Sequence, residues 1–218
     1  SLLGTGGRVW MIDSGRSYER LCRLLGGTYL EFGPKVDIKL NPFTGVGDIR
    51  EEMPLLKDLF AQMAAPKQQL NSLQTARLEE ALARVWQDKG VDATVTDVAE
   101  FLAAHDDETA QRVGVMLYPY TRHGTYARYF DGCANINLDN PFVVLELGEL
   151  DSKPDLQTVV LLMLMKRITE AMYQGDRKQR KLCIVDEAWR LMGRGEAGSF
   201  IEQGYRTARK FGGAFMTI

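Results

Sequence analysis

Two adjacent acids, Asp186 and Glu187, follow the short apolar run Leu182–Val185. Such a run predicts a strand buried in a parallel sheet, and ligands of α/β sheets bind at the carboxyl ends of the strands. Magnesium retains several of its waters and prefers one or two carboxylates together with phosphate oxygens. We therefore interpret Asp186 as a residue of a nucleotide site that holds Mg²⁺ through water. Glu187 can orient or deprotonate an attacking water.

The alternative interpretation of this acid pair is structural, since acids at a strand end also cap the helix that follows. Two arginines nearby favour the chemical interpretation. Arg206 and Arg209 come about one helix length after Glu187, and arginine stabilises the charge of a transferring phosphoryl group in its own subunit or in a neighbouring one. A basic helix end that complements the helix dipole remains the alternative for either arginine.

A third acid, Asp13, ends the apolar run Arg8–Ile12 and is followed by Ser14-Gly15. If that run is another strand of the same parallel sheet, Asp13 lies at the same edge as Asp186. There it can face a nucleotide or a neighbouring subunit. An ordinary turn is the simpler interpretation.

The phosphate-binding loop of P-loop NTPases has no counterpart in this sequence. No Gly-Lys dipeptide occurs, so the pattern Gly-x-x-x-x-Gly-Lys-[Ser/Thr] is absent, and Gly4-Thr-Gly-Gly7 has no lysine and precedes a strand. The residues Ser1–Leu3 resemble the last turn of a helix, and the final residues Gly213–Ile218 resemble a buried strand. We therefore expect an internal fragment, truncated at both ends, whose phosphate loop lies upstream.

The elements around these acids alternate between strand and helix, which predicts an α/β fold with a mostly parallel sheet. The expected elements are a strand at Arg8–Ile12, a helix at Tyr18–Leu25, a strand at Thr28–Phe32, a strand at Phe142–Leu147, a helix at Leu156–Tyr173, a strand at Leu182–Val185, a helix ending near Lys210, and a terminal strand.

An all-helical insertion interrupts this alternation for about eighty residues. A helix is expected after Pro66 to about Lys89, and Thr94 with Asp97 forms a capping box for the next one. The expected domains are residues 1–47 and 131–218, two parts of one α/β core, and residues 48–130, the insertion.

The composition indicates a globular domain of nearly neutral charge. The 218 residues are 45% hydrophobic and 26% charged, with 27 Lys+Arg against 29 Asp+Glu, as expected for a globular domain without a strongly basic or acidic field. The longest apolar run, Val159–Met165, is far shorter than the roughly 20 residues that span a bilayer. Three scattered cysteines and two distant histidines suggest neither a disulfide framework nor a zinc site, and reduced thiols indicate a cytoplasmic setting.

Taken together, several segments resemble the TraC-like ATPases of conjugative type IV secretion systems. They are Val9–Tyr18, Leu40–Phe43, Phe130–Gly132, Leu145–Leu147, Ile184–Trp189 and Ala208–Gly212. The similarity extends from the first strand to the last residue. The Asp-Glu-Ala-Trp strand end and the Ala-Arg-Lys-Phe-Gly run are specific in combination rather than alone.

This resemblance implies a RecA-like P-loop NTPase core that binds ATP and Mg²⁺. It implies that Asp186 is the Walker B metal residue, Glu187 the catalytic carboxylate and Arg209 the arginine finger acting on a neighbour's nucleotide. The parent protein would be a cytoplasmic homo-hexamer, peripherally associated with the bacterial inner membrane and with other secretion components. It would energise type IV secretion, conjugative pilus assembly and DNA transfer, whereas this fragment alone would be inactive.

Two alternatives stay open at this point. One is a DNA-translocating ATPase or coupling protein of the same superfamily, against which stand the near-neutral charge and the lack of a recognised nucleic-acid reading element. The other is a non-catalytic docking or assembly module in which the helical insertion presents the interface.

Overall fold

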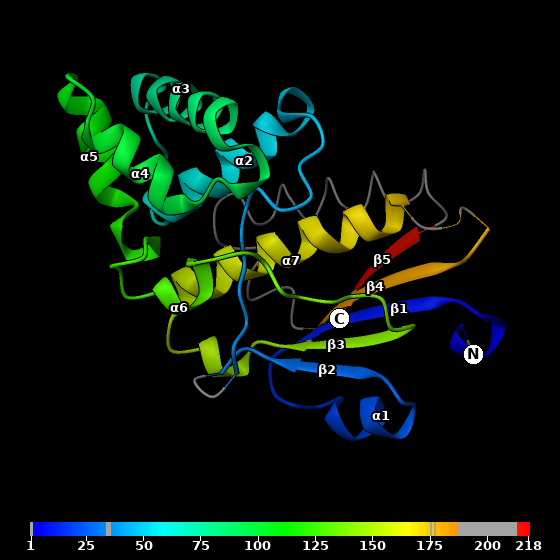
Figure 1. Cartoon of the computed structure of the whole chain (residues 1–218). Coiled ribbons are helices and arrows are strands. Elements are labelled where there is room, and N and C mark those ends of the chain that lie inside the picture. Colours follow the sequence, from blue (N-terminus) through cyan, green and yellow to red (C-terminus); the bar gives the residue numbers. More distant parts are fainter. Residues whose placement is uncertain (1, 34–35, 175, 177, 187–212) are drawn as a thin grey trace. The chain divides into compact units, whose positions relative to one another are not determined.

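A computed structural model describes residues 2–33, 36–174, 176, 178–186 and 213–218 (Figure 1). The chain forms two compact units. Residues 1–36 and 137–218 make up the first unit, and residues 37–136 make up the second. The expected helix ending near Lys210 lies outside the described residues.

The first unit contains a parallel sheet of five strands, as the sequence predicts. The strands are β1 (Arg8–Asp13), β2 (Thr28–Glu31), β3 (Phe142–Glu146), β4 (Lys181–Val185) and β5 (Gly213–Thr217). Their spatial order is β2-β3-β1-β4-β5, so β1 is the central strand and lies between β3 and β4 (Figure 1). All carboxyl ends therefore meet at one edge.

Helices lie on both faces of this sheet (Figure 1). Helix α1 (Glu19–Leu24) connects β1 with β2 and lies on one face, and α7 (Pro154–Gln174) connects β3 with β4 and lies on the other. A single 3-10 turn, η1 (Leu3–Thr5), precedes β1, and another, η4 (Gly148–Leu150), follows β3. Helices on both faces are expected because the strands of a parallel sheet are joined by crossover connections.

Side chains alternate between the two faces of β1 and β3. On the α1 face, Val9, Met11, Phe142 and Val144 pack around the buried Cys22 of α1. On the opposite face Trp10, Ile12, Val143 and Leu145 are all at most 2% exposed. Helix α7 is buried without interruption from Leu156 to Met165, which agrees with its nearly all-apolar sequence.

The second unit is helical. Its elements are α2 (Ile49–Ala64), α3 (Ser72–Lys89), η2 (Gly90–Asp92), α4 (Val95–Ala103), α5 (Glu108–Met116), η3 (Tyr118–Tyr120) and α6 (Ala127–Phe130). Its core includes an aromatic group in which the Phe43 ring centroid lies 5.9 Å from that of Phe60 and 6.3 Å from that of Trp86. None of the helices in the described part of the chain is long and apolar enough to cross a membrane.

Helix starts in this unit follow side-chain caps. The capping box expected from Thr94 and Asp97 is present at α4. Helix α3 begins at Ser72, later than Pro66 suggests, because the Asn71 side chain accepts a hydrogen bond from the Gln74 amide while the Gln74 side chain accepts one from the Asn71 amide.

The helical unit is wider than residues 48–130. The Lys39 amide donates to the Asn135 side chain at 2.8 Å, and the Leu40 amide donates to the Tyr129 carbonyl at 2.6 Å. These bonds join the segments that enter and leave the insertion. The compact unit consequently begins at residue 37 and ends at residue 136.

Candidate functional site

Acidic residues lie at the carboxyl ends of four neighbouring strands. Glu31 ends β2, Glu146 ends β3, Asp13 ends β1, and Asp186 directly follows β4. The registers place Asp13 beside Glu146 and Ile12 beside Val185, so Asp186 follows at the level of Asp13. The structure thus brings Asp13 and Asp186, two residues predicted from the sequence, to neighbouring positions on the same edge.

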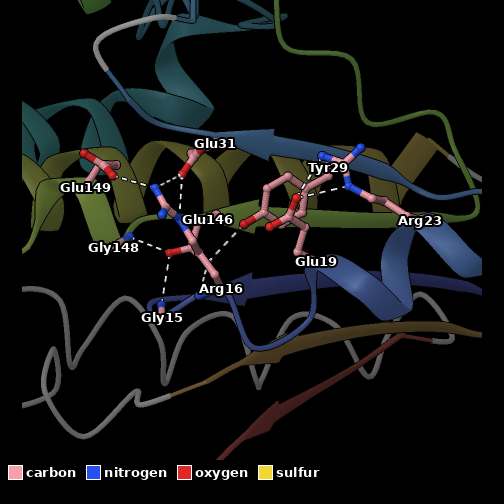
Figure 2. A network of polar contacts seen from close by, with 9 residues as sticks. All are labelled: Gly15, Arg16, Glu19, Arg23, Tyr29, Glu31, Glu146, Gly148 and Glu149. Carbon is pink, nitrogen blue, oxygen red and sulfur yellow. Dashed lines mark hydrogen bonds and ion pairs between the residues drawn. The ribbon is translucent and has the colours of Figure 1, made fainter.

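Glu146 is the most enclosed of these acids, with a relative exposure of 0%. Its Oε1 accepts hydrogen bonds from the Gly15 amide at 3.0 Å and from the Gly148 amide at 2.7 Å. Its Oε2 accepts from the Arg16 amide at 2.7 Å and, at 3.5 Å, from the Tyr29 hydroxyl (Figure 2). This carboxylate therefore fixes the turn that follows β1 and the turn that follows β3 by their backbones.

Gly148 leaves room for that approach. A Cβ added at position 148 would lie 2.7 Å from the Glu146 Oε1 atom, closer than real Cβ atoms come to other atoms. The absence of a side chain lets the turn close over the carboxylate.

Asp13 is also buried, at 2% exposure, and shares a side-chain hydrogen bond with Glu146. The pKa of Asp13 is raised to about 6, first by burial and then by the charge of Glu146, while the Tyr18 amide, which donates to Asp13 Oδ2 at 3.3 Å, opposes the shift. A hydrogen bond between two carboxyl groups requires a proton on one of them. Asp13 thus belongs to a buried carboxyl pair and does not stand free at the edge.

The turn after β1 contains Arg16, whose backbone has φ +59°, an uncommon value for a residue other than glycine. Its guanidinium forms ion pairs with Glu31 and Glu149, each at 2.6 Å (Figure 2). The Ser14 hydroxyl adds a hydrogen bond to Asp151 at 2.9 Å. The ends of β1, β2 and β3 are thereby tied together by side chains.

Asp186 lies at the β4 side of the same edge. Its amide donates to the Ile12 carbonyl at 2.9 Å, which continues the β1–β4 ladder up to the acid. Its side chain is partly exposed and forms a hydrogen bond with the Tyr18 hydroxyl. Burial raises the pKa of Tyr18, and the Asp186 charge raises it further.

The chemistry of Asp186 suits a water-mediated Mg²⁺ ion. Within the residues that the structure describes, no group of three or more His, Cys, Asp or Glu side chains could hold a metal by itself. An ion at this edge would rely on one carboxylate, its own waters and the phosphates of a nucleotide, which is the usual manner for Mg²⁺. Asp186 fits that requirement because it is partly exposed, whereas Asp13 and Glu146 are enclosed.

Other predicted site residues, Glu187, Arg206 and Arg209, lie outside the described residues. The structure also places Glu146, Arg16 and Tyr18 at this edge, and the sequence pattern alone predicts no role for them. The available signal for Glu146 was an acid directly after the apolar run Phe142–Leu145, the same pattern that singled out Asp13 and Asp186.

Comparison with known proteins matches the whole chain to one family. The model of the TraG P-loop domain matches residues 1–96 and 78–218. Among curated proteins, the chain is 34% identical to protein TraC of Escherichia coli (strain K12) over 232 residues, which are 100% of this chain and 26% of TraC. The chain thus spans about a quarter of that relative's length.

Solved structures share the fold. VirB4 of Thermoanaerobacter pseudethanolicus superposes with a TM-score of 0.84 at 23% identity, covering 99% of this chain and 62% of VirB4. The bacterial conjugative coupling protein TrwB, in a form complexed with sulphate, superposes with a TM-score of 0.60 at 13% identity, covering 99% of this chain and 56% of that one. The α/β unit therefore has the RecA-like P-loop fold that the sequence predicts.

Proposed function

Because the chain belongs to the TraG P-loop domain family, we propose that it is the Walker B-bearing part of a Mg²⁺-dependent ATPase motor. The family match and the similarity to TraC support a place among the P-loop ATPases of type IV secretion and conjugation. The proposed task of the parent protein is to energise type IV secretion, conjugative pilus assembly and DNA transfer.

The observation that carries this proposal is the position of Asp186. It stands at the carboxyl end of β4, next to the central strand β1, and its side chain is partly exposed at the edge where α/β sheets bind ligands. Asp186 would hold Mg²⁺ through water, and the ion would neutralise charge on the nucleotide phosphates.

Two further roles belong to the same proposal. Glu187 follows Asp186 directly and would orient or deprotonate the attacking water. Arg209 would stabilise the transferring phosphoryl group of a nucleotide held by a neighbouring subunit, with Arg206 as the alternative finger. A finger that acts on a neighbour requires an oligomer, and we propose a homo-hexamer, peripherally associated with the bacterial inner membrane and with other secretion components.

The experiment compares this chain with a longer polypeptide that includes an upstream phosphate loop, both assayed for Mg-ATP hydrolysis under the same conditions. We expect turnover from the longer polypeptide, none from this chain, and none from the longer Asp186→Asn variant. Undiminished turnover by Asp186→Asn would contradict the assignment of the metal residue.

A second candidate function follows from the fold shared with TrwB, a conjugative coupling protein. A DNA-translocating ATPase would be stimulated by DNA, and the stimulation would fall steeply with salt because phosphate contacts release counterions. DNA-independent turnover would favour the secretion motor.

A further inference from the structure

Tyr18 connects the two acids on neighbouring strands. Its amide donates to Asp13 Oδ2 at 3.3 Å, and its hydroxyl is hydrogen-bonded to the Asp186 side chain. One residue therefore contacts both the buried acid of β1 and the partly exposed acid after β4. It reaches Asp186 from the turn between β1 and α1, far from Asp186 in the sequence.

The packing of Tyr18 restricts where its hydroxyl can go. The side chain is partly buried and packs against the cluster formed by Val9, Met11, Cys22, Phe142 and Val144. Its backbone is the N-cap of α1 and is held by the hydrogen bond to Asp13. A ring fixed at its base and along its side has few rotamers left, so the hydroxyl is held in place before any ligand arrives.

In the hydrogen bond between Tyr18 and Asp186, the tyrosine is the donor and the carboxylate is the acceptor. A tyrosine hydroxyl carries its proton at neutral pH and can donate it in a hydrogen bond, whereas an ionised carboxylate only accepts. A carboxylate has about four lone-pair sites, so a bond from Tyr18 leaves acceptor sites on Asp186 for the waters of a metal ion. A hydrogen bond from Tyr18 on one side can therefore orient the Asp186 carboxylate while its other acceptor sites remain available to metal-bound water.

We propose that Tyr18 is a positioning residue for the metal site, whose hydroxyl donates to Asp186 and orients that carboxylate toward the hydration shell of Mg²⁺. This inference rests on the proposed function, because it assigns to Asp186 the role of metal residue. It adds a residue of the β1–α1 turn to a site otherwise built from the end of β4.

The test measures nucleotide affinity in the full-length protein, with and without Mg²⁺, for the wild type and for Tyr18→Phe. Losing a hydrogen bond to a charged group should weaken Mg-nucleotide binding about tenfold. Affinity measured in EDTA should stay unchanged, since the phosphates and base do not depend on Asp186. The Mg²⁺ concentration that gives half-maximal hydrolysis should rise in parallel.

Tyr29→Phe is the matched control. It removes the same hydroxyl from the adjacent part of the edge, where Tyr29 faces Glu146 and not Asp186. Equal losses of Mg-nucleotide affinity in both variants would overturn the inference, because the effect would then reflect the general stability of the edge. Thermal unfolding of each variant without nucleotide checks that both remain folded.

Asp186→Asn separates the inference from the function on which it rests. If Asp186→Asn leaves the Mg²⁺ dependence of binding unchanged, the proposed metal residue is wrong and the inference falls with it. If Asp186→Asn removes that dependence while Tyr18→Phe does not weaken it, only the inference is overturned. In the double variant, we expect Tyr18→Phe to add no further loss.

Discussion

At the scale of single residues, the edge of the sheet is organised around a buried carboxyl pair. Glu146 accepts amide hydrogen bonds from two turns, and Asp13 lies beside it with its own hydrogen bond to Glu146. Burial and the nearby charge of Glu146 both disfavour the ionised form of Asp13. Asp13 therefore binds a proton at a higher pH than an ordinary aspartate does.

The first prediction is a pH dependence of stability. The pKa of Asp13 is raised to about 6 from its ordinary value of 3.8, so between about pH 4 and pH 6 the folded protein binds a proton that the unfolded chain has released. Stability contributed by this group therefore falls as pH rises through that window. The Asp13→Asn variant has no such proton. Its free energy of unfolding, relative to that of the wild type, should therefore be higher at pH 7 than at low pH by up to about 3 kcal/mol.

Urea unfolding at about pH 4 and at about pH 7, where the window begins and beyond where it ends, measures this difference. Asp106→Asn, which removes an exposed carboxyl from the helical unit, controls for the loss of one charge. If Asp13→Asn destabilised the protein more at pH 7 than at low pH, the fold would favour the charged form of Asp13, and the raised pKa would be wrong.

The second prediction concerns the backbone of Arg16. Arg16→Ala and Arg16→Gly both lose the ion pairs with Glu31 and Glu149, which are solvent-accessible and contribute little. Only glycine relieves the positive φ angle. We expect Arg16→Gly to be more stable than Arg16→Ala by about 1 kcal/mol in chemical unfolding. The same stability for both would mean that the turn relaxes and carries no strain.

At the scale of elements, side-chain caps determine where the helices of the second unit begin. At α4, Asp97 accepts from the Thr94 amide and hydroxyl, each at 2.8 Å, and from Lys89 Nζ at 2.6 Å. Burial alone would raise the pKa of Asp97, but the hydrogen bonds from Lys89 and Thr94 outweigh burial and lower it. The charged form of Asp97 therefore stabilises the fold.

The third prediction follows from the lowered pKa of Asp97. A carboxyl whose pKa is lowered contributes stability above its ordinary pKa, and this contribution is lost as pH falls through the lowered value. Asp97→Asn should cost about 1 to 2 kcal/mol at pH 7 and less at about pH 3. Thermal or urea unfolding at both pH values tests it, and a cost independent of pH would contradict it.

Much of the sheet is predictable because each strand is a short apolar run between glycines and polar residues. That pattern by itself predicts Asp13 and Asp186 at one edge, where the sheet indeed holds them. The role of Glu146 is not predictable, since its partners are backbone amides of Gly15 and Arg16, about 130 positions away. Amides carry no signature in the sequence, and nothing marks Arg16 as a residue with positive φ.

The borders of the helical unit cannot be predicted from the sequence, for a similar reason. The segments on either side of the helices are joined by main-chain bonds such as Leu40 to Tyr129, which local periodicity does not encode. Helix starts are easier to predict where the cap is recognisable, as at Thr94. The start expected from Pro66 is too early, because Asn71 and not the proline caps α3.

At the scale of the whole molecule, the chain consists of an α/β unit and a helical unit, each with its own core. The helical unit is continuous in sequence from residue 37 to residue 136, and its core includes the fully buried Phe43 and Phe60. The α/β unit is assembled from the segments on either side. A continuous segment with a separate core can fold by itself.

The fourth prediction is that residues 37–136 fold as an independent polypeptide. We expect helical circular dichroism and one cooperative unfolding transition. Phe43→Ala in this polypeptide should remove about 3 to 5 kcal/mol of stability, because it empties the centre of the aromatic group. Circular dichroism of a disordered chain would contradict the independence of the unit.

If the edge beside β1 and β4 serves ATP hydrolysis, Glu187→Gln in the full-length protein should separate ATP binding from ATP cleavage. The measurement is ATP binding and single-turnover hydrolysis in the same sample. We predict that the variant binds Mg-ATP as tightly as the wild type and retains it without cleavage, because the glutamine cannot take the proton of the attacking water. Cleavage at the wild-type rate would show that this edge does not perform the hydrolysis.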